Sequence, residues 1–251
     1  MERLNTAHKD RHDMTGERIT IAIDGATHVS GLLARPAAAP RALYVMAHGA
    51  GAGMTHAFME SVASGFTARA IATLRYQFPY MERGSKRVDP PAVAHAAVRA
   101  ACEEAARRVP GVPMFAGGKS FGGRMTSQAQ AATPIAGVHG LVFFGFPLHP
   151  AGKPSDARAA HLADVRIPML FLQGTRDSLA ELKLIEPVVK RLGPSARLHP
   201  VEGADHSFHV LARSGRNDRD VLREILDAFA DWAEGIGHSI YPPLEENFSP
   251  L

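Results

Sequence analysis

The chain of 251 residues is 45% hydrophobic and 21% charged, a balance that is ordinary for a folded globular protein and that excludes general disorder. Its 28 basic and 25 acidic residues give a formal charge of +3 and form no long run of one sign, so we expect no nucleic-acid partner. No stretch of about 18 residues is apolar throughout, so we also expect no membrane-spanning helix.

The first 16 residues are polar and lack the apolar core of a secretion signal, so we interpret 1–16 as a mobile polar lead. The single cysteine, Cys102, cannot form a disulfide within the chain and lies in a helical pattern, where its expected role is packing. One unpaired cysteine is compatible with a reducing compartment. Together these features predict a cytoplasmic protein.

The first predicted elements form a hairpin. Residues 18–24 alternate between apolar and polar, and residues 28–34 follow after an Asp-Gly pair, which predicts an antiparallel hairpin at the edge of a sheet. Residues 42–47 are continuously apolar, as in a strand that is covered on both faces. We therefore expect a central parallel sheet to begin at this strand.

Beyond this strand, apolar strand patterns alternate with helical patterns. Such alternation predicts an α/β fold with a mostly parallel central sheet and helices on both faces. We expect strands at 71–76, 112–116, 137–145, 167–173 and 196–201, and helices at 59–69, 90–109, 125–132, 179–192 and 218–234. Residues 17–236 should form a single domain, and residues 237–251 a polar surface tail.

A serine between glycines stands where a predicted strand ends and a helix begins. Residues 118–122, Gly-Lys-Ser-Phe-Gly, match the pattern G-x-S-x-G. A turn of this kind is so sharp that a side chain at either glycine would collide with its neighbours. In that context Ser120 is a candidate nucleophile. The alternative is a glycine-rich turn with an inert serine, in a chain that has 23 glycines.

A second glycine-rich loop, His-Gly-Ala-Gly-Ala-Gly at 48–53, follows the strand expected at 42–47. Its backbone amides can approach a ligand closely, so the loop is a candidate oxyanion hole, with a flexible loop and a phosphate-binding loop as alternatives. The Gly-Lys-Ser at 118–120 mimics the end of a phosphate-binding motif, but the motif needs a glycine at position 113, which is proline. We expect His48 to support the loop that it begins.

Three polar residues follow strands at the edge where an open α/β sheet binds its ligands. Ser120, Asp177 and His206 occur in the chain order that α/β-hydrolases use. The histidine would take the serine proton, and the carboxylate would orient the histidine. His209 is the alternative base and Asp205 the alternative acid. A metal bound by the two histidines would need a third ligand, for which no convincing spacing exists, so we expect no metal.

These features resemble the α/β-hydrolase superfamily over residues 43–232. More narrowly, five strings resemble the small hydrolase family that is grouped with dienelactone-hydrolase-like proteins and with the hydrolase-like domain of a chromatin-complex subunit. The strings are HGAGA at 48–52, RYQFPY at 75–80, GKSFGGR at 118–124, GFPLHP at 145–150 and QGTRD at 173–177. True dienelactone hydrolases use a cysteine nucleophile, whereas this chain has Ser120, so their substrate does not carry over.

The resemblance implies a serine hydrolase that cleaves an ester or related acyl bond of a small soluble substrate without a cofactor. The amides of Ala50 and Phe121 would form the oxyanion hole. The expected substrate contacts near the strand ends are Gly49, Arg75, Lys119, Arg124 and His149. The alternatives are a catalytically silent binding protein, and a cofactor-free haloperoxidase or acyltransferase with the same triad. We expect a monomer or a homodimer.

The segment in which α/β-hydrolases usually carry a lid is short in this chain. Residues 146–166 contain three prolines and room for one helical turn at 156–163. A segment of this length cannot form a helical cap domain. We therefore expect a minimal cap and an open site.

Overall fold

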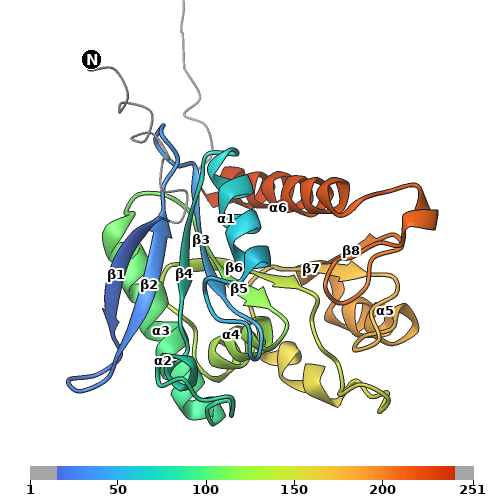
Figure 1. Ribbon diagram of the computed structural model, residues 1–251, viewed down its shortest axis with the longest axis horizontal. Coiled ribbons are helices and arrows are strands. Elements are labelled where there is room, and N and C mark those ends of the chain that lie inside the picture. The colour runs from blue at the N-terminus through green and yellow to red at the C-terminus, as the bar shows by residue number, and fades with distance from the viewer. Residues whose placement is uncertain (1–15, 241–251) are drawn as a thin grey trace, which may run out of the picture.

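The computed structural model describes residues 16–240. In this part of the chain, eight strands form one sheet in the order β1-β2-β4-β3-β5-β6-β7-β8 (Figure 1). Strand β2 is antiparallel to β1 and β4, and the other neighbouring strands are parallel. The strands are β1 (Glu17–Ala22), β2 (His28–Ala34), β3 (Ala42–Ala47), β4 (Ile71–Tyr76), β5 (Met114–Lys119), β6 (Val138–Phe144), β7 (Met169–Gly174) and β8 (Ala196–Val201).

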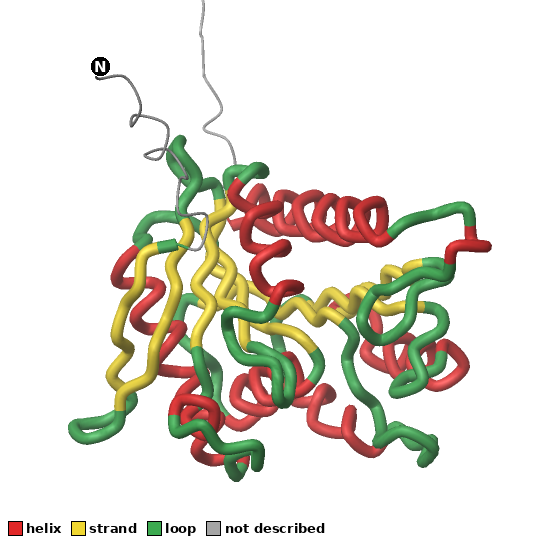
Figure 2. The backbone as a smooth tube through the Cα atoms, viewed as in Figure 1, coloured by secondary structure: helices red, strands yellow, loops and turns green. Residues whose placement is uncertain are grey.

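Helices pack on both faces of this sheet, as Figures 1 and 2 show. Side chains of α1 and α6 share one buried apolar cluster with the sheet, and side chains of α3, α4 and α5 share the other. The helices are α1 (Ala57–Thr67), α2 (Pro79–Glu82), α3 (Pro91–Arg108), α4 (Phe121–Ala132), α5 (Leu182–Leu192) and α6 (Asp218–Ile240), with the short 3-10 helices η1 (Ala157–Asp164), η2 (Gly193–Ser195) and η3 (Ala212–Ser214). This arrangement confirms the predicted fold class.

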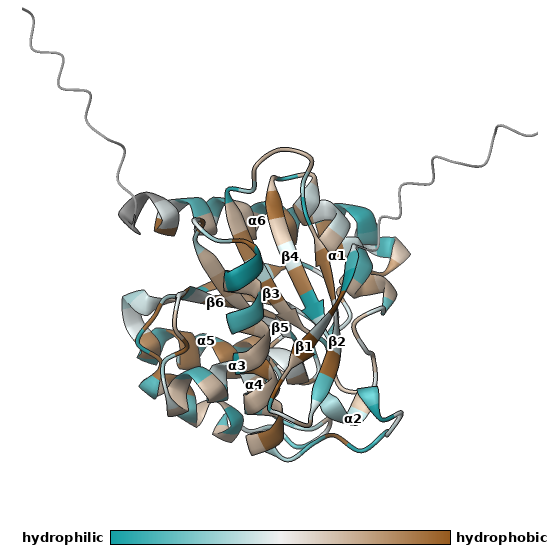
Figure 3. Ribbon diagram, turned by 90° about the vertical axis from the view of Figure 1, so that its left-hand side faces the viewer, coloured by the Kyte–Doolittle hydropathy of each residue, from teal (hydrophilic) through white to brown (hydrophobic). Residues whose placement is uncertain are grey.

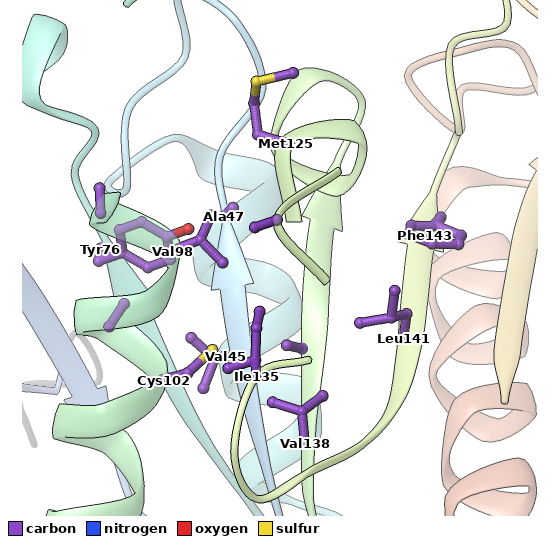
Figure 4. Packing of buried hydrophobic residues seen from close by; sticks show 14 of the residues in the cluster. Val45, Ala47, Tyr76, Val98, Cys102, Met125, Ile135, Val138, Leu141 and Phe143 are labelled. Carbon is purple, nitrogen blue, oxygen red and sulfur yellow. The ribbon is translucent and has the colours of Figure 1, made fainter. Parts of the chain in front are cut away.

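Strand β3 supplies side chains to both clusters, because successive side chains of a strand point to opposite faces. Tyr44 and Met46 belong to the cluster with α1 and α6. Val45 and Ala47 belong to the cluster with α3 and α4, where Figure 4 shows them together with Cys102. The thiol of Cys102 is buried there, as expected for a packing residue. Burial on both faces explains why β3 is apolar at every position.

The helices bury one face each. The buried residues of α1 recur at helical spacing, at Met59, Val62, Ala63 and Phe66. In Figure 3 the inner strands are largely hydrophobic, whereas hydrophilic residues lie on outer turns of the helices and on loops. Within residues 16–240, no helix combines the length and the apolar character needed to cross a bilayer.

The expected edge hairpin is present, and β1 is the edge strand. The helix after the candidate nucleophile, however, begins at Phe121, four residues earlier than predicted. Gly122 and Gly123 suggested a turn, but both lie in the first turn of α4. A Cβ added at Gly122 would lie 2.5 Å from the Ala47 carbonyl oxygen. These glycines therefore allow α4 to pack closely on β3, and they do not interrupt the helix.

Two further differences concern short or terminal segments. Helix α2, four residues long, was not predicted because one turn leaves no periodic pattern. Helix α6 continues to Ile240, past residue 236, at which we expected the domain to end. Residues 1–15 and 241–251, and with them most of the expected lead and the remaining tail, lie outside the described residues.

The connection from β6 to β7 contains only the eight-residue helix η1 in regular structure. Helix η1 lies where we predicted a helical turn at 156–163, shifted by one residue. Figure 1 shows this short helix in yellow beside α4, with no helical domain above the carboxyl ends of the strands. The expected minimal cap is therefore present.

Candidate active site

Ser120 occupies the single residue between β5 and α4, with φ 50° and ψ −113°. A positive φ is strained for a residue with a side chain and persists only where the surroundings impose it. The two flanking glycines make this tight turn possible, because a Cβ at Gly118 would lie 2.1 Å, and at Gly122 2.5 Å, from the Ala47 carbonyl oxygen. The resulting turn lifts the partly exposed serine hydroxyl above the sheet.

The structure brings the three residues of the expected triad together from the carboxyl ends of β5, β7 and β8. His206 Nε2 lies 2.9 Å from Ser120 Oγ, and His206 Nδ1 lies 2.6 Å from Asp177 Oδ2. Because the carboxylate can only accept, Nδ1 carries the ring proton and Nε2 presents its lone pair to the serine hydroxyl. In this tautomer the histidine can act as a general base toward Ser120.

The carboxylate of Asp177 is buried and held by three donors. Besides His206, the backbone amide of Leu179 donates to Oδ1 at 2.8 Å, and Gln173 Nε2 donates to Oδ2 at 2.5 Å. The fully buried Gln173 accepts the amide of Phe146 through Oε1 at 2.9 Å. Gln173 was not among the predicted site residues. Its signal was available, since a glutamine inside a buried apolar strand needs polar partners.

Lys119 lies on the far side of His206 from Asp177. Its Nζ donates a hydrogen bond to the His206 carbonyl oxygen. It also lies 5.9 Å and 5.4 Å from the ring centroids of Phe58 and Phe208. Burial lowers the pKa of Lys119 to about 8. We expected Lys119 to contact the substrate; its ammonium donates to the loop that carries His206, and a contact with the substrate stays a prediction.

The alternative acid and base lie outside this chain of hydrogen bonds. Asp205 Oδ1 accepts the backbone amides of Ser207 and His209 at 2.8 Å and 3.0 Å, so it closes its own loop. His209 Nδ1 lies 2.9 Å from Asp218 Oδ2 and is exposed. Asp218 raises the pKa of His209. Within residues 16–240, no three His, Cys, Asp or Glu side chains are grouped as they would be around a metal ion.

The glycine-rich loop after β3 lies directly against the nucleophile turn. A Cβ added at Gly49 would lie 3.9 Å from Ser120 Cβ. Tyr80 Oη accepts the amide of Gly51 at 3.2 Å, which ties this loop to α2. Phe121 is the first residue of α4, and the amide of a first helical residue has no acceptor within its helix. The amide of Phe121 therefore adjoins Ser120, and the contribution of the Ala50 amide to the oxyanion hole stays a prediction.

His48 anchors the start of the glycine-rich loop. Its Nε2 accepts the Phe78 amide at 3.1 Å, so its Nδ1 carries the proton and donates to the Gly49 carbonyl oxygen at 2.8 Å. The side chain is fully buried, and burial lowers its pKa to about 4. His48 is therefore neutral and supports the loop, as the sequence analysis expected.

This burial predicts acid sensitivity. A folded-state pKa of about 4 against an ordinary value of 6.5 means that His48 contributes fully to stability above pH 6.5 and that this contribution is lost as the pH falls through 4. The loss is on the order of 3 kcal/mol. We expect His48→Gln to flatten the fall in the free energy of unfolding over this range, measured by urea denaturation. His28→Gln, at an exposed histidine of β2, is the control, and an equal flattening there would contradict the assignment.

Two other expected substrate contacts lie in the interior. Arg75 is fully buried on β4, and its Nη1 donates to the Met54 carbonyl oxygen at 3.1 Å. His149 is also fully buried, with Nε2 2.8 Å from Glu181 Oε2. Both side chains hold loops, and neither has access to a substrate, so these two expectations are wrong. Arg124 is half-buried beside the Phe121 ring and keeps access to the site.

Solved structures with the same fold share little sequence with this chain. A serine hydrolase homologue from Coxiella burnetii is 15% identical with a TM-score of 0.67, over 86% of this chain and 97% of its own. A serine hydrolase without a lid from Xanthomonas campestris is 19% identical with a TM-score of 0.66, over 91% and 95%. A dienelactone hydrolase from Anabaena variabilis is 20% identical with a TM-score of 0.67, over 88% and 98%. At these identities the likeness shows the fold.

The sequence also matches a known family directly. The sequence model described as an alpha/beta hydrolase domain matches residues 40–234. The match extends over β3 to β8 and includes Ser120, Asp177 and His206. It spans well over half of the chain, and it agrees with the folds of the similar solved structures. The protein is a hydrolase-fold protein that belongs to the alpha/beta hydrolase domain family.

Proposed function

We propose that the protein is a serine hydrolase that cleaves carboxylic esters of small molecules through an acyl-enzyme on Ser120. The observation that carries this proposal is the continuous chain of hydrogen bonds from Ser120 Oγ through His206 to the buried Asp177. The spacing of 2.9 Å and 2.6 Å is that of a nucleophile, its base and the group that orients the base. A protein of this fold without catalytic activity would not need these three side chains to be joined by hydrogen bonds.

The proposed reaction has two halves. Ser120 Oγ attacks the ester carbonyl carbon while His206 Nε2 takes the hydroxyl proton, and the carbonyl electron pair moves to oxygen. Collapse of this intermediate expels the alcohol, which receives the proton from His206, and leaves the acyl group on Ser120. A water molecule then gives a proton to His206 and attacks the acyl carbon. When this second intermediate collapses, His206 returns the proton to Ser120 Oγ, and the carboxylic acid is released. Asp177 stabilises the imidazolium in both halves.

The amides of Ala50 and Phe121 would stabilise the oxyanion of each intermediate. Their contribution depends on a loop that does not rearrange during the reaction. His48 and Tyr80 supply that rigidity through hydrogen bonds to Phe78, Gly49 and Gly51. The proposal is also supported by the neighbours of known structure, since those from Coxiella burnetii and Xanthomonas campestris are described as serine hydrolases.

A fluorophosphonate probe tests the proposal directly, because it reacts only with a serine that is activated as a nucleophile. We expect stoichiometric labelling of the native protein, with the mass increment on the tryptic peptide that contains Ser120. Protein unfolded in urea before the probe is added should not be labelled. Labelling of a different serine, or no labelling of native protein that is folded by circular dichroism, would contradict the proposal.

The minimal cap predicts a preference for short acyl chains. Each buried methylene contributes about 0.8 kcal/mol only where a wall exists to bury it against. The connection that carries η1 has eight helical residues and forms no enclosing domain. We therefore expect kcat/KM to be highest for p-nitrophenyl acetate to butyrate and to fall for longer esters, without activation at a lipid interface. A maximum at octanoate or longer would show that a hydrophobic tunnel exists.

A further inference from the structure

Two arginines lie on α4 and on the neighbouring η1. Arg124 lies in the first turn of α4, and its backbone amide donates to the Ser120 carbonyl oxygen at 3.1 Å. Arg158 lies in η1, which packs on α4. Neither guanidinium forms an ion pair within residues 16–240. Arg124 Nε is buried and has no hydrogen-bond partner there.

The side chain of Arg124 extends toward the site. Side chains of a helix tilt toward its amino end, so a residue in the first turn points back over the residue one turn earlier. In agreement, the Arg124 guanidinium carbon lies 5.9 Å from the centroid of the Phe121 ring. One helical turn rises about 5.4 Å, so this charge lies within reach of a short substituent on an ester bound at Ser120.

Within residues 16–240, no carboxylate forms an ion pair with Arg124. Burial, and to a smaller extent the positive charge of Arg158 on the neighbouring η1, lower the pKa of Arg124. His161 of η1 lies 2.7 Å from Ser127 Oγ, and burial lowers its pKa to about 4, so it adds no charge at neutral pH. Buried polar atoms normally have partners, and each exception calls for an explanation. Among the described residues, Arg124 Nε is such an exception.

We propose that Arg124 and Arg158 form a subsite for a carboxylate group of the substrate, so that the preferred substrates are esters that carry a second, ionised carboxyl group. This inference rests on the proposed hydrolase function. A guanidinium presents a planar fork of donors that matches the two oxygens of a carboxylate. A bound carboxylate would supply the acceptor that Arg124 Nε lacks and would relieve the repulsion between the two arginines.

Pairs of matched esters test this subsite. The acyl side is tested by p-nitrophenyl hydrogen adipate against p-nitrophenyl hexanoate, which has the same chain length and no charge. The alcohol side is tested by 4-acetoxybenzoate against 4-acetoxybenzamide. We expect kcat/KM to favour the charged member of one pair by about tenfold at low salt, which is typical of one charge-assisted contact. Salt should reduce the preference.

Substitutions then locate the subsite. Arg124→Gln and Arg158→Gln should each lower the ratio of charged to neutral kcat/KM by about fivefold or more. Arg107→Gln is the matched control, because it removes the same charge from an exposed ion pair on α3. Equal ratios for the two members of both pairs in the wild type would overturn the inference. An equal fall of this ratio in Arg107→Gln and Arg124→Gln would also overturn the inference, because the preference would then arise from the general surface charge of the protein.

A binding measurement separates this inference from the proposed hydrolysis. Isothermal titration of adipate into the Ser120→Ala protein requires no catalysis, and adipamide serves as the neutral probe. We expect adipate to bind, adipamide not to bind, and binding of adipate to be lost when Arg124→Gln is added. Adipate binding through Arg124 in a protein without esterase activity would leave the subsite standing and refute the proposed function. Ester hydrolysis without adipate binding and without a charge preference would refute only the subsite.

Discussion

Replacing Ser120 with alanine is expected to abolish hydrolysis of p-nitrophenyl acetate, with a loss in kcat on the order of 10⁶, the size seen when a serine protease loses its nucleophile. The reason is that no acyl-enzyme can form without Ser120 Oγ, and His206 would have no group to deprotonate at 2.9 Å. The thermal midpoint should change little, because the substitution removes one partly exposed hydrogen bond worth about 1 kcal/mol. Steady-state kinetics and calorimetry on the same preparation measure both effects.

Ser127→Ala is the matched control for this experiment. Ser127 also contacts a histidine, with His161 Nε2 2.7 Å from its hydroxyl, but it lies within α4 and not in a strained turn. Among the described residues, no carboxylate is hydrogen-bonded to His161. We therefore expect Ser127→Ala to keep nearly all of the esterase activity. Activity that survives Ser120→Ala and disappears in Ser127→Ala would mean that the nucleophile is misassigned.

The second large effect is expected at Asp177. Asp177→Asn keeps the shape of the side chain, but an amide nitrogen facing His206 Nδ1 favours the tautomer in which Nε2 carries the proton. In the worked serine-protease case this change lowers kcat by about 10⁴. We expect a loss of that size here, because Asp177 is buried and His206 Nδ1 is bonded to its Oδ2 at 2.6 Å. His206→Ala should be at least as severe, and kcat at saturating ester measures both.

Asp205→Asn and His209→Ala are the neighbouring controls. Asp205 only closes the loop through the amides of Ser207 and His209, and His209 is bonded to Asp218. Their loss should lower kcat by less than about tenfold, through small shifts of the loop. A loss at Asp205 or His209 equal to that at Asp177 would show that the acid or the base has been placed on the wrong residue.

Part of the loop around His206 could not be derived from sequence. Phe208 adopts φ 65°, which is rare for an aromatic residue and has no sequence signature. This turn places the Phe208 ring parallel to that of Phe58, at 5.7 Å, and the Lys119 ammonium lies 5.9 Å from the Phe58 centroid and 5.4 Å from the Phe208 centroid. Lys119 in turn holds the His206 carbonyl. The contact pairs residues 87 positions apart, and only packing brings them together.

The buried side chains of Arg75 and His149 show a second limit of prediction from sequence. Arg75 lies on β4 between Leu74 and Tyr76, which both face the cluster with α3 and α4. Alternation along the strand therefore indicated that Arg75 faces the other layer, although its position in the sequence suggested the ligand edge. His149 lies only five residues after the end of β6, yet it turns inward to Glu181. Proximity to a strand end along the chain does not determine the direction of a side chain in a loop.

The sequence by itself determined the layer order, the parallel sheet, the short cap and the three strand ends at which Ser120, Asp177 and His206 stand. It could do so because apolar periodicity, glycine geometry and chain order are local properties. Only the tertiary structure decided which side chains touch: that His206 and not His209 faces Ser120, that Gln173 holds Asp177, and that Arg124 is half-buried while Arg75 is fully buried. The physical reason is that side-chain direction in a loop depends on backbone turns and on packing between distant segments, which a local pattern does not record.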